Sequence, residues 1–115
     1  MMELTKSELS EMLHACCNVV NEGENALLTQ NHYPGIVYWE YVWTPISASG
    51  TDYGTSVTYQ VSVLSKEPRS KALLKLRAML AKRGIMPTWY HEYDQEKKIF
   101  HSYCSLDVLE EIPEE

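Results

Sequence analysis

Long apolar runs are missing from this sequence, and so is the order of charged and apolar residues that marks a secretory signal. No run approaches the roughly 18–20 apolar residues that cross a bilayer. The first residues, MMELTKSELSEM, carry acids where a signal peptide carries bases. These absences predict a soluble chain that is made in, and folds in, a cytoplasm.

Cysteine is scarce as well. The three cysteines are Cys16, Cys17 and Cys104. Adjacent cysteines on a helix point in different directions, and an odd count leaves at least one thiol unpaired. The sequence therefore predicts reduced, buried thiols rather than a disulfide framework.

Motifs for metal binding and catalysis are also lacking. The four histidines and three cysteines form no C-x-x-C or H-x-x-x-H pattern, and no serine lies in a G-x-S-x-G elbow. Residues 49–54 contain two glycines but lack the lysine and the strand-to-helix context of a phosphate loop. His91 and His101 would face each other across a hairpin only if its loop had three residues. We therefore expect no enzyme, no metal and no cofactor.

The composition that is present describes one ordinary globular domain. The chain has 115 residues, of which 44% are hydrophobic and 23% charged. This length supports one core and is too short for two. We expect a single domain over residues 1–115, with an acidic tail from about residue 107.

Periodicity predicts an α+β domain in the order α-β-β-α-β-β. Helices are expected over about residues 5–22, after a Thr5–Glu8 capping box, and over 68–83. Strands are expected over 36–43, 56–64, 88–93 and 98–104, where β-branched and aromatic residues alternate with others. The simplest arrangement is a four-stranded, mostly antiparallel sheet with both helices packed on one face. In the strand over 56–64, the side chains predicted to face the core are Val57, Tyr59, Val61 and Val63. In the strand over 36–43, the side chains predicted to share one face are Val37, Trp39, Tyr41 and Trp43.

Positive charge is concentrated in the second predicted helix. Residues 66–83 hold seven of the ten lysines and arginines but one of the sixteen acids, so this segment is net +6 and the remainder is net −12. Three interpretations are open: a solvated face, a surface that docks head-to-tail on an acidic surface of another copy, or the lining of a channel that DNA crosses. The candidate contact residues for a subunit or a DNA channel are Lys71, Lys75, Arg77 and Lys82.

A succession of elements resembles one protein family. It consists of the loop Thr51-Asp52-Tyr53-Gly54, a strand, a helix ending LRAMLAKRG and a hairpin with the acidic turn 94–96. Over roughly residues 33–109 this order resembles the tail-component proteins of siphoviruses from Gram-positive hosts, of the tail-terminator or tail-completion type. The sequence departs from the family at that turn, which commonly reads Asp-Pro-Asp and here reads Asp94-Gln95-Glu96.

The resemblance implies a structural role in a phage or prophage tail. Such proteins form a ring, usually of six subunits, which ends the tail tube and joins it to the head-side connector. The implied partners are other copies of the chain, the tube protein and the connector protein, with DNA only as a transient non-specific contact and no membrane. The implied location is the host cytoplasm during assembly and then the virion tail.

Residues 44–55 are expected to form a long loop between two strands. With the resemblance, Thr51, Asp52, Tyr53 and Gly54 become candidates for a projecting contact with the tube or a neighbouring subunit. A different class of function also fits the sequence: a monomeric, non-catalytic adaptor that binds another protein through a sheet edge.

Overall fold

The described part of the chain, residues 4–23, 33–48 and 51–110 of a computed structural model, forms two helices and five strands. The sheet has the order β1-β2-β3-β5-β4, in which β1 runs parallel to β2 and all other neighbours are antiparallel. The α+β class is therefore confirmed. The predicted number of strands is wrong, because the sheet has five strands and not four. The elements are α1 (Lys6–Cys16), β1 (Val20–Glu22), β2 (Gly35–Ala48), β3 (Thr51–Ser65), α3 (Lys71–Lys82), β4 (Tyr90–Asp94) and β5 (Ile99–Glu110).

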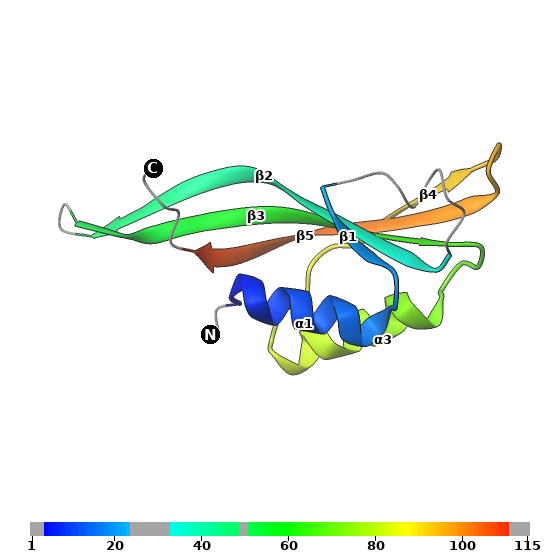
Figure 1. The fold of residues 1–115 in the computed structure, drawn as a ribbon, viewed down its shortest axis with the longest axis horizontal. Helices are drawn as coiled ribbons and strands as arrows, with labels where there is room; N and C mark the ends of the chain where they lie inside the picture. The colour runs from blue at the N-terminus through cyan, green and yellow to red at the C-terminus, as the bar shows by residue number, and fades with distance from the viewer. Residues whose placement is uncertain (1–3, 24–32, 49–50, 111–115) are drawn as a thin grey trace.

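Both helices lie on the same face of the sheet, antiparallel to each other (Figure 1). An ion pair of 3.1 Å joins Arg83, just after α3, to Glu8 in the first turn of α1. At the other end of α1, the Cys16 thiol contacts the Met79 sulfur at 3.5 Å. Neither helix in the described residues is long and apolar enough to span a membrane.

The first helix begins as predicted but ends earlier. Thr5 accepts from the backbone of Glu8, and the Glu8 carboxylate accepts from the backbone of Thr5, which completes the capping box. The predicted end at residue 22 is wrong, because the helix stops at Cys16 and Cys17 is extended. The β-branched Val20 instead opens β1, which pairs with β2 and supplies the fifth strand.

The second helix starts after Ser70, whose hydroxyl accepts from the backbone N–H of Leu73. Pro68, the predicted first-turn residue, precedes it. Gly84 follows the helix at φ +77°, a left-handed conformation that suits glycine and ends the helix as predicted. Four residues of α3 face the core: Ala72, Leu73, Leu76 and Leu80.

Strand β3 carries the core, and its predicted inward face is confirmed. Val57, Tyr59, Val61 and Val63 are all at most 1% exposed and pack against the two helices. The Tyr59 hydroxyl donates to the Glu110 carboxylate of β5 at 2.7 Å, so this large buried side chain has its polar group satisfied. Burial and this bond raise the pKa of Tyr59.

The predicted loop over residues 44–55 is wrong at both ends, because each strand continues into it. Strand β2 extends to Ala48 and β3 begins at Thr51, which pairs with Ala48. A register shift between Ile46 and Ser47 takes up the extra residue, and Gly54, opposite Ile46, has φ +129°. Glycine is required there because a Cβ at Gly54 would also meet the Glu110 carbonyl oxygen at 3.1 Å.

A second irregularity changes the faces predicted for β2. The pairing shifts between Glu40 and Val42, which leaves Tyr41 as the extra residue of a bulge. After the bulge, Trp43 lies opposite Val57 and no longer shares the face of Trp39. The predicted single face through Tyr41 and Trp43 is therefore wrong from the bulge onward.

The α3 stripe provides a test of this packing. Replacing Leu76, which is 0% exposed, with alanine should lower the free energy of unfolding by about 2–5 kcal/mol, because a buried cavity is left. Leu74→Ala on the same helix is the matched control, since Leu74 is 49% exposed and its loss should cost about 0.5 kcal/mol or less. Urea denaturation measures both values. Equal losses would contradict the assignment of the buried face.

Candidate assembly surfaces

The four basic residues singled out from the sequence are all exposed on α3, but they lie on two different flanks of the helix. At 100° per residue, Lys71, Lys75 and Lys82 fall within one narrow row. Arg77 lies on the opposite side of the buried stripe. The predicted basic surface is therefore two surfaces.

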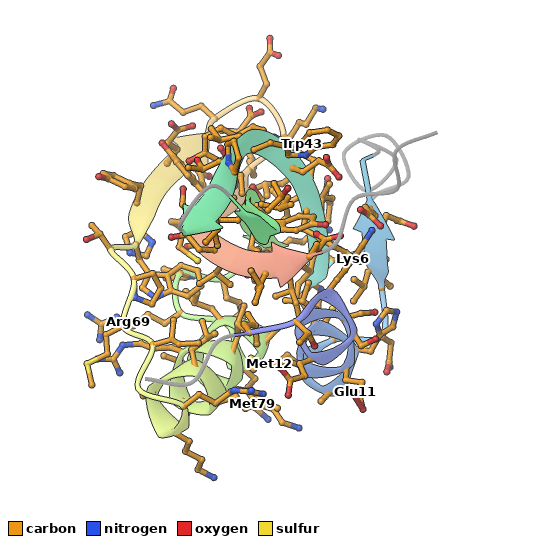
Figure 2. The ribbon with its side chains drawn as sticks, turned by 90° about the vertical axis from the view of Figure 1, so that its left-hand side faces the viewer. Lys6, Glu11, Met12, Trp43, Arg69 and Met79 are labelled. Carbon is orange, nitrogen blue, oxygen red and sulfur yellow. The ribbon has the colours of Figure 1, made fainter. Side chains whose placement is uncertain are left out.

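The lysine row lies on the flank of α3 that is turned toward α1. Met79, next to this row, contacts Cys16 of α1, and Met12 and Met79 lie between the two helices in Figure 2. Burial raises the pKa of the Cys16 thiol, and the positive charge of Lys75 opposes that shift. Among the described residues no acid forms an ion pair with these lysines.

The other flank carries Arg77 together with Arg69, which precedes the helix. In Figure 2, Arg69 lies on the side of α3 away from α1. Arg69 and Arg77 line a cavity with Trp89 and His91, at the start of β4. Arg69 was not predicted as a site residue, although it belongs to the basic segment.

The residues predicted to project as a loop lie at the start of β3. The backbone of Thr51 pairs with Ala48 and that of Asp52 with Ser47, while Gly54 lies opposite Ile46. Tyr53 falls between these pairs, at the register shift. They therefore belong to the outer end of the long β2–β3 hairpin (Figure 1). A contact role for Thr51, Asp52, Tyr53 and Gly54 stays a prediction.

Within the described residues, strand β5 lacks a partner along one edge over part of its length. It pairs with β3 from Phe100 to Glu110, but with β4 only from Ile99 to Tyr103. Beyond that, Leu4 lies at this edge: it forms a parallel bridge with Val108, and its carbonyl accepts from the Leu109 N–H at 3.0 Å. Because backbone groups alternate along a strand, the N–H groups of Ser105 and Asp107 also point away from β3.

A groove follows this open edge. Its volume is about 370 Å³, and its lining is mainly apolar, with contributions from both sides of the sheet. Met86, 81% exposed, and Ile46, 36% exposed, are the large apolar side chains most open to solvent within it. The edge therefore offers hydrogen-bonding groups beside apolar surface, the combination that binds an extended strand.

Strands β2, β3 and β5 are neighbours in the sheet, and on the side of β2 this group has a protected edge. Strand β1 pairs with β2 only from Ile36 to Tyr38, so the described residues leave the rest of β2 without an outer neighbour. That stretch carries the bulge at Tyr41 and the imino acid Pro45, two features that discourage edge pairing. The β5 edge has neither, and the Asp107 carboxylate is bonded to the Thr58 hydroxyl at 2.7 Å.

The histidines of the hairpin do not meet. Asp94 pairs with Ile99, so the loop has four residues, and His91 lies opposite Ser102 rather than His101. His91 bonds the Ser102 hydroxyl at 2.8 Å, and His101 bonds the Ser62 hydroxyl at 2.8 Å. Within the described part of the chain, no three His, Cys, Asp or Glu side chains lie close enough to share a metal ion.

The described cysteines are free thiols, as the sequence predicts. Cys104 is 1% exposed, and burial raises the pKa of its thiol to about 12. A thiol held neutral in this way is a poor nucleophile. It acts as a core side chain.

The edge of β5 and its groove were not predicted from the sequence, because both depend on which strands pair. Leu4, Met86 and Ser105 come from three distant segments, and no motif joins them. The run from Leu106 to Glu110 alternates like a strand, which was the available signal. In the described structure this run has no strand partner beyond β3 because β4 starts at Tyr90, which pairs with Tyr103.

The half-buried His101 predicts how stability responds to pH. Burial lowers its pKa, although Glu92, at 4.0 Å, acts in the opposite direction. The unfolded chain, with a histidine pKa of about 6.5, then binds a proton that the folded state does not, so the free energy of unfolding should fall as pH drops below about 6.5. Urea denaturation between about pH 7 and pH 5 should show a shallower fall for His101→Gln and a steeper one for Glu92→Gln. Identical slopes for all three proteins would contradict this assignment.

The chain was compared with protein-family models, curated proteins and solved structures. No protein-family model, curated protein or solved structure matches the chain. The likeness to siphovirus tail components therefore stays a prediction from the sequence.

Proposed function

We propose that this chain is a structural subunit of a phage or prophage tail. It assembles into a ring that ends the tail tube and joins the tube to the head connector. The tail role comes from the sequence resemblance. The structure contributes one supporting observation: among the described residues, the β5 edge at Ser105 and Asp107 lacks a strand partner and lies beside an apolar groove.

An unprotected edge beside apolar surface supports assembly with protein rather than catalysis. Natural sheets protect exposed edges with bulges, prolines and charges, because a free edge recruits other strands. The β2 edge has a bulge at Tyr41 and a proline at Pro45, whereas the β5 edge from Cys104 to Asp107 has neither a bulge nor a proline. An edge that lacks a partner among the described residues, has no bulge or proline and lies beside an apolar groove is best explained as a binding surface.

A ring requires this edge to make a head-to-tail contact, in which it meets a different surface of the next copy. A contact between two unlike surfaces cannot close on itself in a pair, and it repeats into a ring when the rotation permits. The exposed lysine row of α3 then faces either a neighbouring subunit or DNA in the central channel.

The same edge would also serve a second function. A monomeric adaptor that takes a strand from an unrelated protein needs the groove and the β5 edge, and needs no second copy of itself. Self-association in solution separates the two proposals.

The edge is tested by removing one N–H. Ser105→Pro deletes the outward donor and should lower self-association by about tenfold, since a strand partner loses a hydrogen bond and meets the proline ring. Ser105→Ala is the matched control, because it loses only the hydroxyl that bonds Tyr41 at 2.8 Å. Light scattering over a concentration series measures the mass.

A closed oligomer that persists in Ser105→Pro would contradict the edge as the contact. A wild-type monomer at all concentrations, together with capture of a strand from another protein, would favour the adaptor.

Charge reversal tests the lysine row. The triple variant Lys71→Glu, Lys75→Glu and Lys82→Glu should stay folded, since all three side chains are exposed and unpaired among the described acids. If the row contacts a neighbour, the salt-sensitive part of self-association should fall in sedimentation experiments. Unchanged assembly would assign the row to the channel or to solvent.

A further inference from the structure

The cavity on the second flank of α3 combines cationic and apolar walls. It has a volume of about 360 Å³ and lies between α3 and the segment that leads into β4. The apolar wall includes Leu74, which is 49% exposed, and Trp89, which also packs against the core. The complete lining is Arg69, Leu73, Leu74, Arg77, Trp89 and His91.

The charged groups of this cavity are free to take an anion. Arg69 and Arg77 are exposed, and among the described residues neither forms an ion pair. His91 uses Nδ1 to bond Ser102, which leaves its other ring nitrogen without a bond in the described structure. Guanidinium groups match carboxylates through paired hydrogen bonds. A ligand that suits both walls carries carboxylates next to an apolar side chain.

The chain itself contains such a segment. Residues 111–115 read Glu-Ile-Pro-Glu-Glu, so three carboxylates surround Ile112 and Pro113. The residue before them, Glu110, is held to β3 by its bond with Tyr59. This anchor fixes where the acidic segment leaves the sheet.

The cavity and the anchor lie in different halves of the molecule. In Figure 1, β5 ends in the left half, whereas β4 and the first turns of α3 lie in the right half. The long axis measures 51 Å, and five residues span at most about 18 Å even when fully extended. This geometry favours a contact between two copies over one within a single chain.

We propose that the cavity between Arg69, Arg77 and Trp89 binds the acidic segment 111–115 of a second copy of this chain. The proposal rests on the proposed self-assembly and names one of its contacts. It joins the cavity of one subunit to the end of β5 of the next, which is a head-to-tail contact. Such contacts repeat in one direction and close into a ring when the rotation permits.

The first test measures binding of a labelled peptide with the sequence of residues 107–115 to the full chain, by fluorescence anisotropy at low salt. Binding to Arg69→Glu/Arg77→Glu should be about tenfold weaker or more, because two charge-assisted contacts become repulsive. The control is Lys71→Glu/Lys75→Glu, which changes the net charge equally on the other flank and should bind like wild type. Equal affinities of the two double variants would overturn the proposal.

A third variant distinguishes loss of binding from loss of folding. Arg69 has φ 110°, a conformation that favours glycine, so Arg69→Gly removes the guanidinium without backbone strain. It should keep the thermal stability of wild type and still weaken peptide binding. A stable Arg69→Gly that binds the peptide as wild type does would count against the cavity.

The second test asks whether the contact runs head-to-tail. A cavity variant, Arg69→Glu/Arg77→Glu, and a segment variant, Glu111→Lys/Glu114→Lys/Glu115→Lys, should each lose salt-sensitive self-association. Mixed in equal amounts they should associate again in alternation, because one pairing joins the wild-type cavity to the wild-type segment and the other joins the two reversed charges. A chain carrying both sets of changes should regain association through reversed charges.

Two results separate this proposal from the ring itself. A salt-insensitive ring that forms with the cavity variant overturns the segment contact and leaves the proposed function standing. Peptide binding that needs Arg69 and Arg77 without any closed oligomer supports the contact and counts against the ring. A peptide that binds neither wild type nor any variant overturns the proposal.

Discussion

The alternation of small polar and large apolar side chains along β3 is the constraint on which the rest of the structure depends. This strand lies at the centre of the sheet, and its inward residues form the floor on which both helices pack. Because the period of a strand is two, a shift of one residue would turn Tyr59 toward solvent and bring Gln60 into the core. The hydrogen bond between Tyr59 and Glu110 also favours this register, since it forms only when β3 and β5 are correctly aligned.

The two proposed contacts follow from what this core leaves uncovered. Both helices pack on one face, so among the described residues the length of β4 and the contact at Leu4 decide how much of the β5 edge lacks a partner. The packing of α3 likewise divides its positive charge, because the buried stripe through Leu76 separates Lys75 from Arg77. One flank then lies beside α1, and the other lies beside Trp89.

Much of the fold could be predicted from the sequence, since the alternation of β3 and the helical stripes are local patterns. The capping box at Thr5 and the glycine at position 84 likewise work within a few residues. What failed depends on partners distant in the sequence. Residues 20–22, predicted as the end of the first helix, instead pair with β2. The faces of β2 change at a bulge that no residue type in the sequence indicates. Of the candidate site, the basic residues were found by composition, but their division between two flanks required the packed helix.

One bond joins the two ends of the described chain: the Leu109 N–H and the Leu4 carbonyl meet beside β5. All residues from Leu4 to Leu109 must leave the ribosome before this pair can form, because Leu4 and Leu109 lie far apart in the sequence. Until then Tyr59 has no Glu110, and the β5 edge does not exist as a surface. A nascent or truncated subunit therefore lacks the edge through which it could join an assembly, so synthesis itself orders folding before association.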